Sequence, residues 1–335
     1  MHRAAWIALA LFALVPLMGV GNYYLHLAIT VMLWSFIYTS WSIMGRFGLV
    51  SFGHGAFMGI GAYVTTMLWN HYGVTPWIGI PTAVVLSVVL SVLIGYPCFR
   101  FRITGHYFAL VTLALTEVVR LMIVALRDVT GGSLGVTPDS ALAGQAYSIY
   151  AIQFADKEVF FYIALGFWLF ALYLWRRVDR SMMRYAMQAI SQEEDASASV
   201  GINVTRTKLV ITMLSAALTA LGGALYGQYQ QYINPDTVSG IGISLQIVFA
   251  VIAGGMFVQL GPTVGAIFTL MLAEGLRVAI GNEIHGLDST IYGLMLVLFI
   301  IYMPNGILGK YFEVRDRAPA MDAKTGGKNS GAAPA

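Results

Sequence analysis

Two pairs of charged residues lie inside apolar stretches and could do chemistry within a membrane. Glu117 and Arg120 are three positions apart, and Glu274 and Arg277 repeat this spacing. Residues at i and i+3 share one face of a helix, where an acid and a base can neutralise each other. A charge in lipid is costly and is therefore a candidate functional group. We expect intramembrane ion pairs, with guidance of a zwitterionic solute or proton coupling as alternatives.

A glycine-rich stretch from Gly48 to Tyr63 and a later apolar segment carry small and polar residues at helical spacing. Small residues four positions apart predict a flat helix face for close packing. The histidine in the first stretch is either a hydrogen-bonded structural residue or part of a polar path. The candidate pathway or packing residues are Ser51, Gly53, His54, Gly55, Gly59, Ser215, Thr219 and Gly223.

No pattern in the chain favours an enzyme. The six histidines include no His-x-x-x-His spacing for a metal, and the single cysteine, Cys98, has no partner for a disulfide. No lysine completes the Gly-x-x-x-x-Gly-Lys-Ser/Thr loop that binds nucleotide phosphates. We expect no catalytic residues, no metal and no cofactor in this chain, so that any work driven by ATP must come from a partner.

Composition places the chain in a membrane. Of its 335 residues, 58% are hydrophobic and 10% are charged, whereas soluble domains carry about 25% charge. Apolar runs of about 18 residues or more are long enough to cross the hydrocarbon core. We predict an all-α, polytopic transmembrane bundle of about ten segments, the third and eighth of which are candidates for re-entrant or broken spans. The segments are 4–20, 24–44, 47–69, 76–98, 106–126, 158–175, 209–230, 243–259, 262–281 and 289–308.

The distribution of basic residues predicts the orientation of these segments. If both termini are cytoplasmic, most of the 19 Lys and Arg residues fall on the cytoplasmic side, as the positive-inside rule requires. The charges form no basic stripe that would bind nucleic acid. We predict a transmembrane domain over 1–309 and a disordered cytoplasmic tail over 310–335. Two glycine-rich stretches, 48–63 and 254–266, each precede a Glu-x-x-Arg span, which suggests an internal duplication.

The longest predicted cytoplasmic loop, about 176–207, carries an acidic run followed by small residues. This pattern predicts a short helix that stops at a glycine. Its small residues permit close docking in a groove of another protein, and an ordinary solvated loop helix is the alternative. The residues concerned are Glu193, Glu194, Asp195, Ala196, Ser197 and Gly201.

From about residue 25 to 309 the chain resembles the ABC-transporter permeases for branched-chain amino acids, of the LivM type. Asp195-Ala196-Ser197-x-x-x-Gly201 is similar to the Glu-Ala-Ala-x-x-x-Gly loop by which importer permeases engage their ATPase subunits. The chain departs from that loop at Arg184-Tyr185-Ala186 and at Ser191. Further matches are 48–63, 105–110, 112–114, 130–132, 201–203, 215–217 and 304–309.

The resemblance implies a permease subunit of an ABC importer in the bacterial inner membrane. Its partners would be a second permease subunit, two ABC ATPase subunits that bind the ATP, and a periplasmic substrate-binding protein. The implied solutes are branched-chain or other small amino acids. A permease for urea or short amides, and a secondary transporter driven by an ion gradient, are the alternatives.

Overall fold

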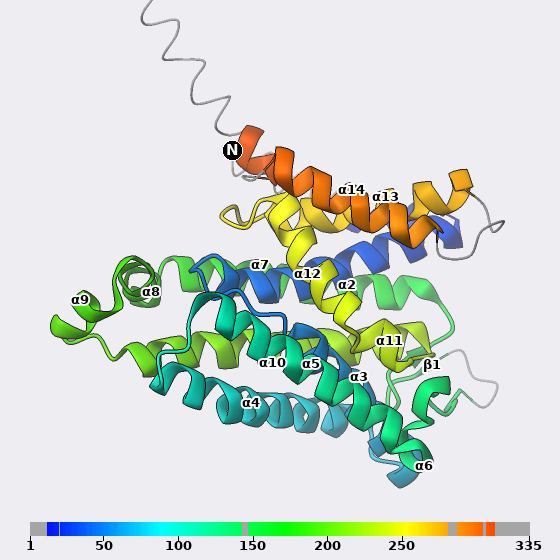
Figure 1. Cartoon of the computed structure of the whole chain (residues 1–335). Helices are drawn as coiled ribbons and strands as arrows, with labels where there is room; N and C mark the ends of the chain where they lie inside the picture. The colour runs from blue at the N-terminus through cyan, green and yellow to red at the C-terminus, as the bar shows by residue number, and fades with distance from the viewer. Residues whose placement is uncertain (1–11, 20, 143–146, 281–286, 304–305, 312–335) are drawn as a thin grey trace, which may run out of the picture. The chain divides into compact units, whose positions relative to one another are not determined.

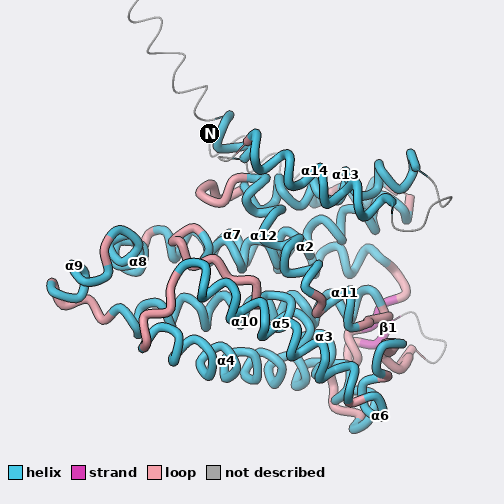
Figure 2. The backbone as a smooth tube through the Cα atoms, viewed as in Figure 1, coloured by secondary structure: helices cyan, strands magenta, loops and turns pink. Residues whose placement is uncertain are grey.

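The structure is a computed structural model of the whole chain, and it describes residues 12–19, 21–142, 147–280, 287–303 and 306–311. The chain divides into two compact units, Met1–Val248 and Phe249–Ala335, and each is described by itself. The predicted tail falls almost entirely outside the described residues. Most of the described chain is helical, as Figure 2 shows.

The first unit is a bundle of helices with one small hairpin. Strands β1 and β2 pair antiparallel, with Tyr147 opposite Phe154. Figure 1 shows α8 and α9 at one end of this unit and the hairpin with α6 at the opposite end. The elements are η1 (Val15–Met18), α2 (Asn22–Gly45), α3 (His54–Tyr72), α4 (Pro76–Arg100), α5 (Gly105–Ala125), α6 (Arg127–Thr130), η2 (Gly132–Leu134), β1 (Tyr147–Ser148), β2 (Gln153–Phe154), α7 (Lys157–Asp179), α8 (Met182–Gln192), α9 (Glu194–Ser199), α10 (Val204–Gln230), α11 (Pro235–Val238) and α12 (Ile241–Gly254).

The predicted helical, membrane-spanning character is confirmed, and the count of about ten segments stays a prediction. Among the described residues, 6 helical segments are long and apolar enough to cross a membrane. Most of the span predicted at 4–20 lies outside the described residues. The third predicted span, 47–69, was placed too early, because α3 begins only at His54. These six segments are Asn22–Gly45, Pro76–Arg100, Gly105–Ala125, Lys157–Asp179, Val204–Gln230 and Pro235–Gly254.

Helix α10 is the centre of the first unit, because it packs against α2, α3 and α4. Its contact with α3 depends on small residues. A Cβ atom at Gly61 would collide with the carbonyl oxygen of Ala220, and one at Gly223 would collide with that of Met58. Such close backbone approach replaces side-chain bulk where helices associate in lipid. Of the small residues predicted for close packing, Gly223 lies in this contact, whereas Gly55 and Gly59 of α3 face Ser244 and Ser239 instead.

An aromatic and aliphatic core lies on another side of α10, where α2 packs against α7. Ile29 and Leu33 of α2 are buried there with Phe161 and Leu165 of α7 and Leu225 of α10. Burial of such side chains stabilises a bundle through dispersion contacts even where lipid is the solvent. The helices α2, α3, α7 and α10 thus form one packed body.

The second unit contains the end of α12 and two further helices, α13 (Gly261–Ile280) and α14 (Leu287–Tyr302). Helix α12 ends at Gly254, and Gly255 follows with a φ of 110°, a conformation that suits glycine. A Cβ at Gly265 of α13 would collide with the carbonyl oxygen of Ala250, so these helices also approach closely. Helices α13 and α14 pack against each other.

The close approach of α3 and α10 predicts the effect of adding one methyl group. We expect Gly223→Ala to destabilise the protein by about 1–3 kcal/mol, because its Cβ meets the backbone of Met58. Gly166→Ala in α7 is the matched control, since nothing lies within 4 Å of its Cβ position. Thermal unfolding of the detergent-purified protein measures both effects. Equal stability of the two variants would contradict the packing described.

Candidate functional site

The segment between α2 and α3, residues 46–53, is not helical but is largely buried in the bundle. Side chains of the neighbouring helices bond several of its backbone groups. The indole Nε1 of Trp41 donates to the carbonyl oxygen of Ser51 at 2.7 Å. The backbone N–H of Phe52 donates to Thr112 Oγ1 at 3.0 Å. Non-helical backbone at membrane depth is tolerated only where protein surrounds it in this way.

The first turn of α3 is held by hydroxyl groups from α5 and α12. Thr116 Oγ1 donates to the carbonyl oxygen of Phe52 at 2.7 Å, and the Gly55 N–H donates to Ser244 Oγ at 3.0 Å. A Cβ at Gly55 would stand 2.6 Å from that Ser244 oxygen, so a larger residue would displace the hydroxyl. Gly55 and Gly59 share one face of α3, whereas Ser51, predicted on the same helix face, precedes the helix.

His54 joins α3 to α10 and α2 through a buried chain of hydrogen bonds. Its Nε2 lies 2.8 Å from Ser215 Oγ, and Ser215 Oγ donates its hydrogen to the carbonyl oxygen of Ser40 at 2.6 Å. Because that hydroxyl has one hydrogen, it must accept from His54 Nε2–H. The hydroxyls of Ser40 and Thr219 are 2.7 Å apart. Three predicted residues, His54, Ser215 and Thr219, thus belong to one network.

The first predicted ion pair lies in α5 and has a further partner. Arg120 Nη2 lies 2.6 Å from Glu117 Oε1, and Arg120 Nη1 lies 3.1 Å from Asp236 Oδ1 of α11. The guanidinium is therefore shared between two carboxylates on different helices. In the second pair, Glu274 lies in α13, and the side chain of Arg277 is outside the described residues.

The predicted loop helix ends at a glycine, as expected, but it is divided into α8 and α9 at Glu193. The backbone of Glu193 is extended, with φ −155° and ψ 112°, and Gly201 follows α9 with a φ of 91°. Ser197 is buried, and its hydroxyl donates to the carbonyl oxygen of Glu193 at 2.8 Å. The acidic and small residues of α9 thus form a compact turn of helix.

Two ion pairs attach α9 to the transmembrane helices. Glu194 pairs with Lys208 of α10, whose side chain is only 4% exposed. Asp195 Oδ1 lies 2.7 Å from Arg102 Nη1 in a pair that is exposed on both sides. A buried ion pair is costly to break by removal of one partner, whereas an exposed pair contributes little. Lys208 is therefore the main electrostatic anchor of α9.

Two further ion pairs share Asp179 at the same end, where α2 and α7 meet α8. Asp179 accepts from Arg46 Nη1 at 3.0 Å and from Arg184 Nη1 at 3.2 Å. The Arg46 guanidinium also stacks on the Trp175 ring, 4.1 Å from its centroid, which is a cation–π contact. Burial lowers the pKa of Arg46 to about 10, against the opposing effect of Asp179, so that Arg46 stays charged at neutral pH.

Several residues of this arrangement were not singled out from the sequence. No local pattern marked Lys208 as the partner of Glu194, or Asp236 as a partner of Arg120. Thr112 and Thr116 share one face of α5, a spacing that could have indicated a polar contact. Residues 131–135 read Gly-Gly-Ser-Leu-Gly, which has the Gly-x-Ser-x-Gly spacing. They form the turn η2 after a helix, not the strand-to-helix turn that exposes a nucleophile.

Comparison with known proteins places this chain among transport proteins. Residues 23–303 match the profile of the family described as "Branched-chain amino acid transport system / permease component". No solved structure matches the chain.

The curated relatives include both permease types of one transport system. The chain is 28% identical over 284 residues to the high-affinity branched-chain amino acid transport system permease protein LivM of Escherichia coli (strain K12), covering 79% of this chain and 65% of the relative. The LivM protein of Salmonella typhimurium shows the same identity and coverage. The LivH protein of E. coli K12 is 26% identical over 279 residues, which cover 80% of this chain and 88% of LivH.

The buried network around His54 predicts a contrast between two serine variants. We expect Ser215→Ala to destabilise the protein by about 1–3 kcal/mol, because the His54 Nε2–H and the Ser40 carbonyl lose their partner. Ser87→Ala is the control, since its buried hydroxyl has no partner among the described residues. Thermal unfolding compares the two variants. A Ser87→Ala variant less stable than Ser215→Ala would refute the network.

Proposed function

The chain belongs to the family of branched-chain amino acid transport permease components, and we propose that it is the channel-forming permease subunit of an ABC importer. The solutes proposed are branched-chain or other small amino acids. The observation that supports this most is the family match over 23–303, which includes all but the first residue of α2 and every later helix through α14, with the α8–α9 loop. The chain itself would bind no ATP and catalyse no reaction.

The proposed complex has two permeases, two ATPase subunits and a periplasmic binding protein. Relatives named LivM and LivH both resemble this chain, which favours a second, related permease as its membrane partner. Both termini and the α8–α9 loop would lie on the cytoplasmic side of the inner membrane, as the basic residues favour. The end of the first unit that carries the β1–β2 hairpin would then face the binding protein.

The surface of α9 suits contact with an ATPase subunit. Glu193, Asp195, Ala196 and Ala198 are exposed, and Val200 is 77% exposed. Small side chains let a helix enter a groove closely, and an acidic edge complements basic residues on a partner. The first two residues of α9, Glu194 and Asp195, pair with Lys208 and Arg102. Because α9 is short, a force on its surface would also move the elements that carry these two basic residues.

The pair between Glu194 and Lys208 is the proposed link between ATPase and transport path. If α9 moved without α10, Lys208 would be left buried without its carboxylate, which costs several kcal/mol. Helix α10 therefore follows α9. Ser215 of α10 is hydrogen-bonded to His54 at the start of α3. A displacement of α10 would therefore reach α3 and residues 46–53, which precede it. This transmission is a rigid-body movement of packed helices.

Reconstitution tests the proposed function. We expect uptake of radiolabelled leucine into proteoliposomes only when the second permease, the ATPase subunits, the binding protein and ATP are all present. Uptake by this chain alone under a proton or sodium gradient would instead establish a secondary transporter. Uptake of urea or short amides, with no uptake of leucine, would redirect the assignment to a permease for those solutes.

A charge swap tests the link between α9 and α10. Glu194→Lys and Lys208→Glu each place two like charges together, so we expect each to lower ATP-driven uptake at least tenfold, in line with the several kcal/mol at stake. The double variant restores an ion pair and should recover much of the uptake. ATP hydrolysis measured in the same vesicles shows whether coupling is lost while the complex persists.

Arg102→Gln is the control for this experiment, because its pair with Asp195 is exposed and contributes little. We expect it to retain uptake near that of the unmodified complex. Single variants that transport normally would remove the Glu194–Lys208 link from the mechanism. A double variant no better than either single variant would do the same if the complex still assembles.

A further inference from the structure

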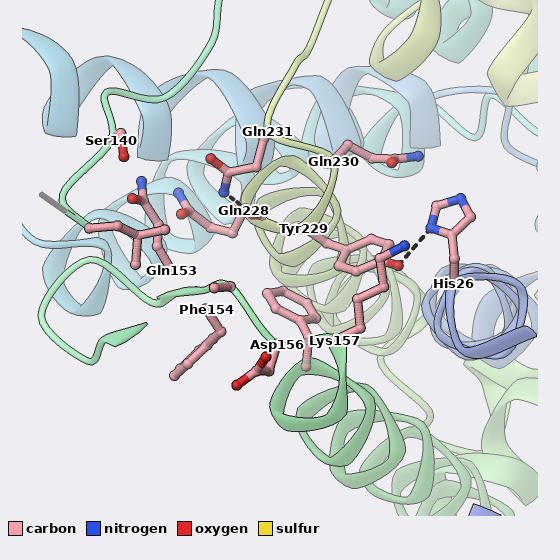
Figure 3. A pocket seen from close by; sticks show the side chains of 13 residues that line it. His26, Ser140, Gln153, Phe154, Asp156, Lys157, Gln228, Tyr229, Gln230 and Gln231 are labelled. Carbon is pink, nitrogen blue, oxygen red and sulfur yellow. Dashed lines mark hydrogen bonds between the residues drawn. The ribbon is translucent and has the colours of Figure 1, made fainter. Parts of the chain in front are cut away.

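A polar cavity of about 240 Å³ lies where three helix ends meet the β1–β2 hairpin. His26 lies near the start of α2, Lys157 begins α7, and Gln228 lies near the end of α10. Figure 3 shows these side chains around the cavity, together with those of the hairpin. In the proposed orientation this end of the first unit faces the periplasm, opposite α8 and α9.

The wall of the cavity contains a buried amide with unused hydrogen-bonding capacity. Gln228 is 2% exposed, and neither its Oε1 nor its Nε2 has a hydrogen-bond partner among the described residues. The side-chain amides of two neighbouring glutamines already have hydrogen-bond partners. Gln153 Nε2 donates to the carbonyl oxygen of Asp139 at 2.9 Å, and Gln230 Nε2 donates to Tyr226 Oη at 3.0 Å. A buried, unpaired amide is costly, so Gln228 favours a ligand that both accepts and donates.

Two opposite charges border the same cavity. Asp156 and Lys157 are consecutive residues, and both line it. Among the described residues, the Lys157 ammonium donates to one backbone oxygen, that of Asn22 at 3.4 Å, which leaves donors for a ligand. An α-amino acid carries a carboxylate and an ammonium group close together. Charge-assisted hydrogen bonds from both groups would orient such a zwitterion.

Part of the wall is apolar. Phe154, Phe160 and Leu142 line the cavity beside Tyr229. The Phe160 and Tyr229 rings lie 4.8 Å apart, and Tyr229 Oη is 2.6 Å from His26 Nδ1. These contacts hold the aromatic side chains in place. A pocket with apolar walls and a few fixed polar groups is typical of small-molecule sites.

We propose that this cavity binds a zwitterionic amino acid with an aliphatic side chain at the outer end of the permease. Lys157 binds the carboxylate, Asp156 binds the ammonium group, and Gln228 bonds to both. Phe154, Phe160 and Leu142 contact the aliphatic side chain. The inference rests on the proposed function, and it identifies where a solute released by the binding protein first contacts this chain.

Protection from labelling tests binding directly. Ser140 is exposed at the cavity, and Cys98 is the single cysteine, so Ser140→Cys in a Cys98→Ala background gives one reactive thiol at the site. We expect leucine to slow maleimide labelling of the purified complex in proportion to its concentration. Ser133→Cys, exposed and outside the cavity, is the control. Isobutyramide carries an amide and a shorter branched carbon chain but no zwitterion.

Protection by leucine and not by isobutyramide supports the proposal. Protection by isobutyramide alone, or by neither compound, overturns it, because the site would then select amides or hold only water. These outcomes need no transport, so they are independent of the proposed importer function. If leucine slows labelling of the Ser140→Cys thiol but the unmodified complex does not import leucine, the proposed importer function is wrong and the proposed binding site is still supported.

Uptake measurements on one isosteric variant complete the test. Gln228→Leu removes the amide at similar volume, and we expect it to raise the concentration of loaded binding protein for half-maximal uptake about three- to tenfold, as the loss of about one hydrogen bond implies. Ser133→Ala, exposed and outside the cavity, is the control and should leave this concentration unchanged. Equal half-maximal concentrations for Gln228→Leu and the unmodified complex would overturn the role of Gln228.

Discussion

The backbone of residues 46–53 must find hydrogen-bond partners within protein, and much of the first unit is arranged to supply them. An extended peptide in lipid has no water to bond. Trp41, Thr112 and Thr116, from α2 and α5, bond the carbonyl of Ser51 and the amide and carbonyl of Phe52. These hydrogen bonds therefore fix the relative positions of α2, α3 and α5. A substitution of one of the three side chains would leave a buried backbone group without its partner.

The same constraint explains how a movement at one end of the bundle can reach its interior. Helix α10 contacts α3 through glycine-sized gaps at Gly61 and Gly223 and through the bond from Ser215 to His54. Its other end is tied to α9 by Lys208 and Glu194. These contacts are close backbone approaches and buried polar pairs, which cannot be stretched gradually without loss of packing or of hydrogen bonds. The helices that they join are therefore expected to move together. Helix α10, held at both α3 and α9, would then move as a rigid body, as a gate with an open and a closed state requires.

Much of this fold could be predicted from the sequence, because length and hydropathy alone identify apolar helices such as α4, α5 and α7. The spacing of Glu117 and Arg120 anticipated two groups that the structure brings together. The late start of α3 at His54 could not be predicted, since hydropathy does not distinguish buried non-helical backbone from helix. The Glu194–Lys208 pair and the cavity at Gln228 depend on contacts between separate elements, which no local pattern encodes.

Cross-linking of α9 to an ATPase subunit tests the central claim most directly. Ala198 is exposed on α9, and Ala198→Cys in a Cys98→Ala background gives one thiol on that surface. In the assembled importer we predict a cross-link from this thiol to the ATPase subunit through a short bifunctional reagent, with a yield that changes when ATP is added. A thiol that never cross-links in the assembled complex, or that reacts with a membrane-impermeant maleimide from the periplasmic side, would contradict the account.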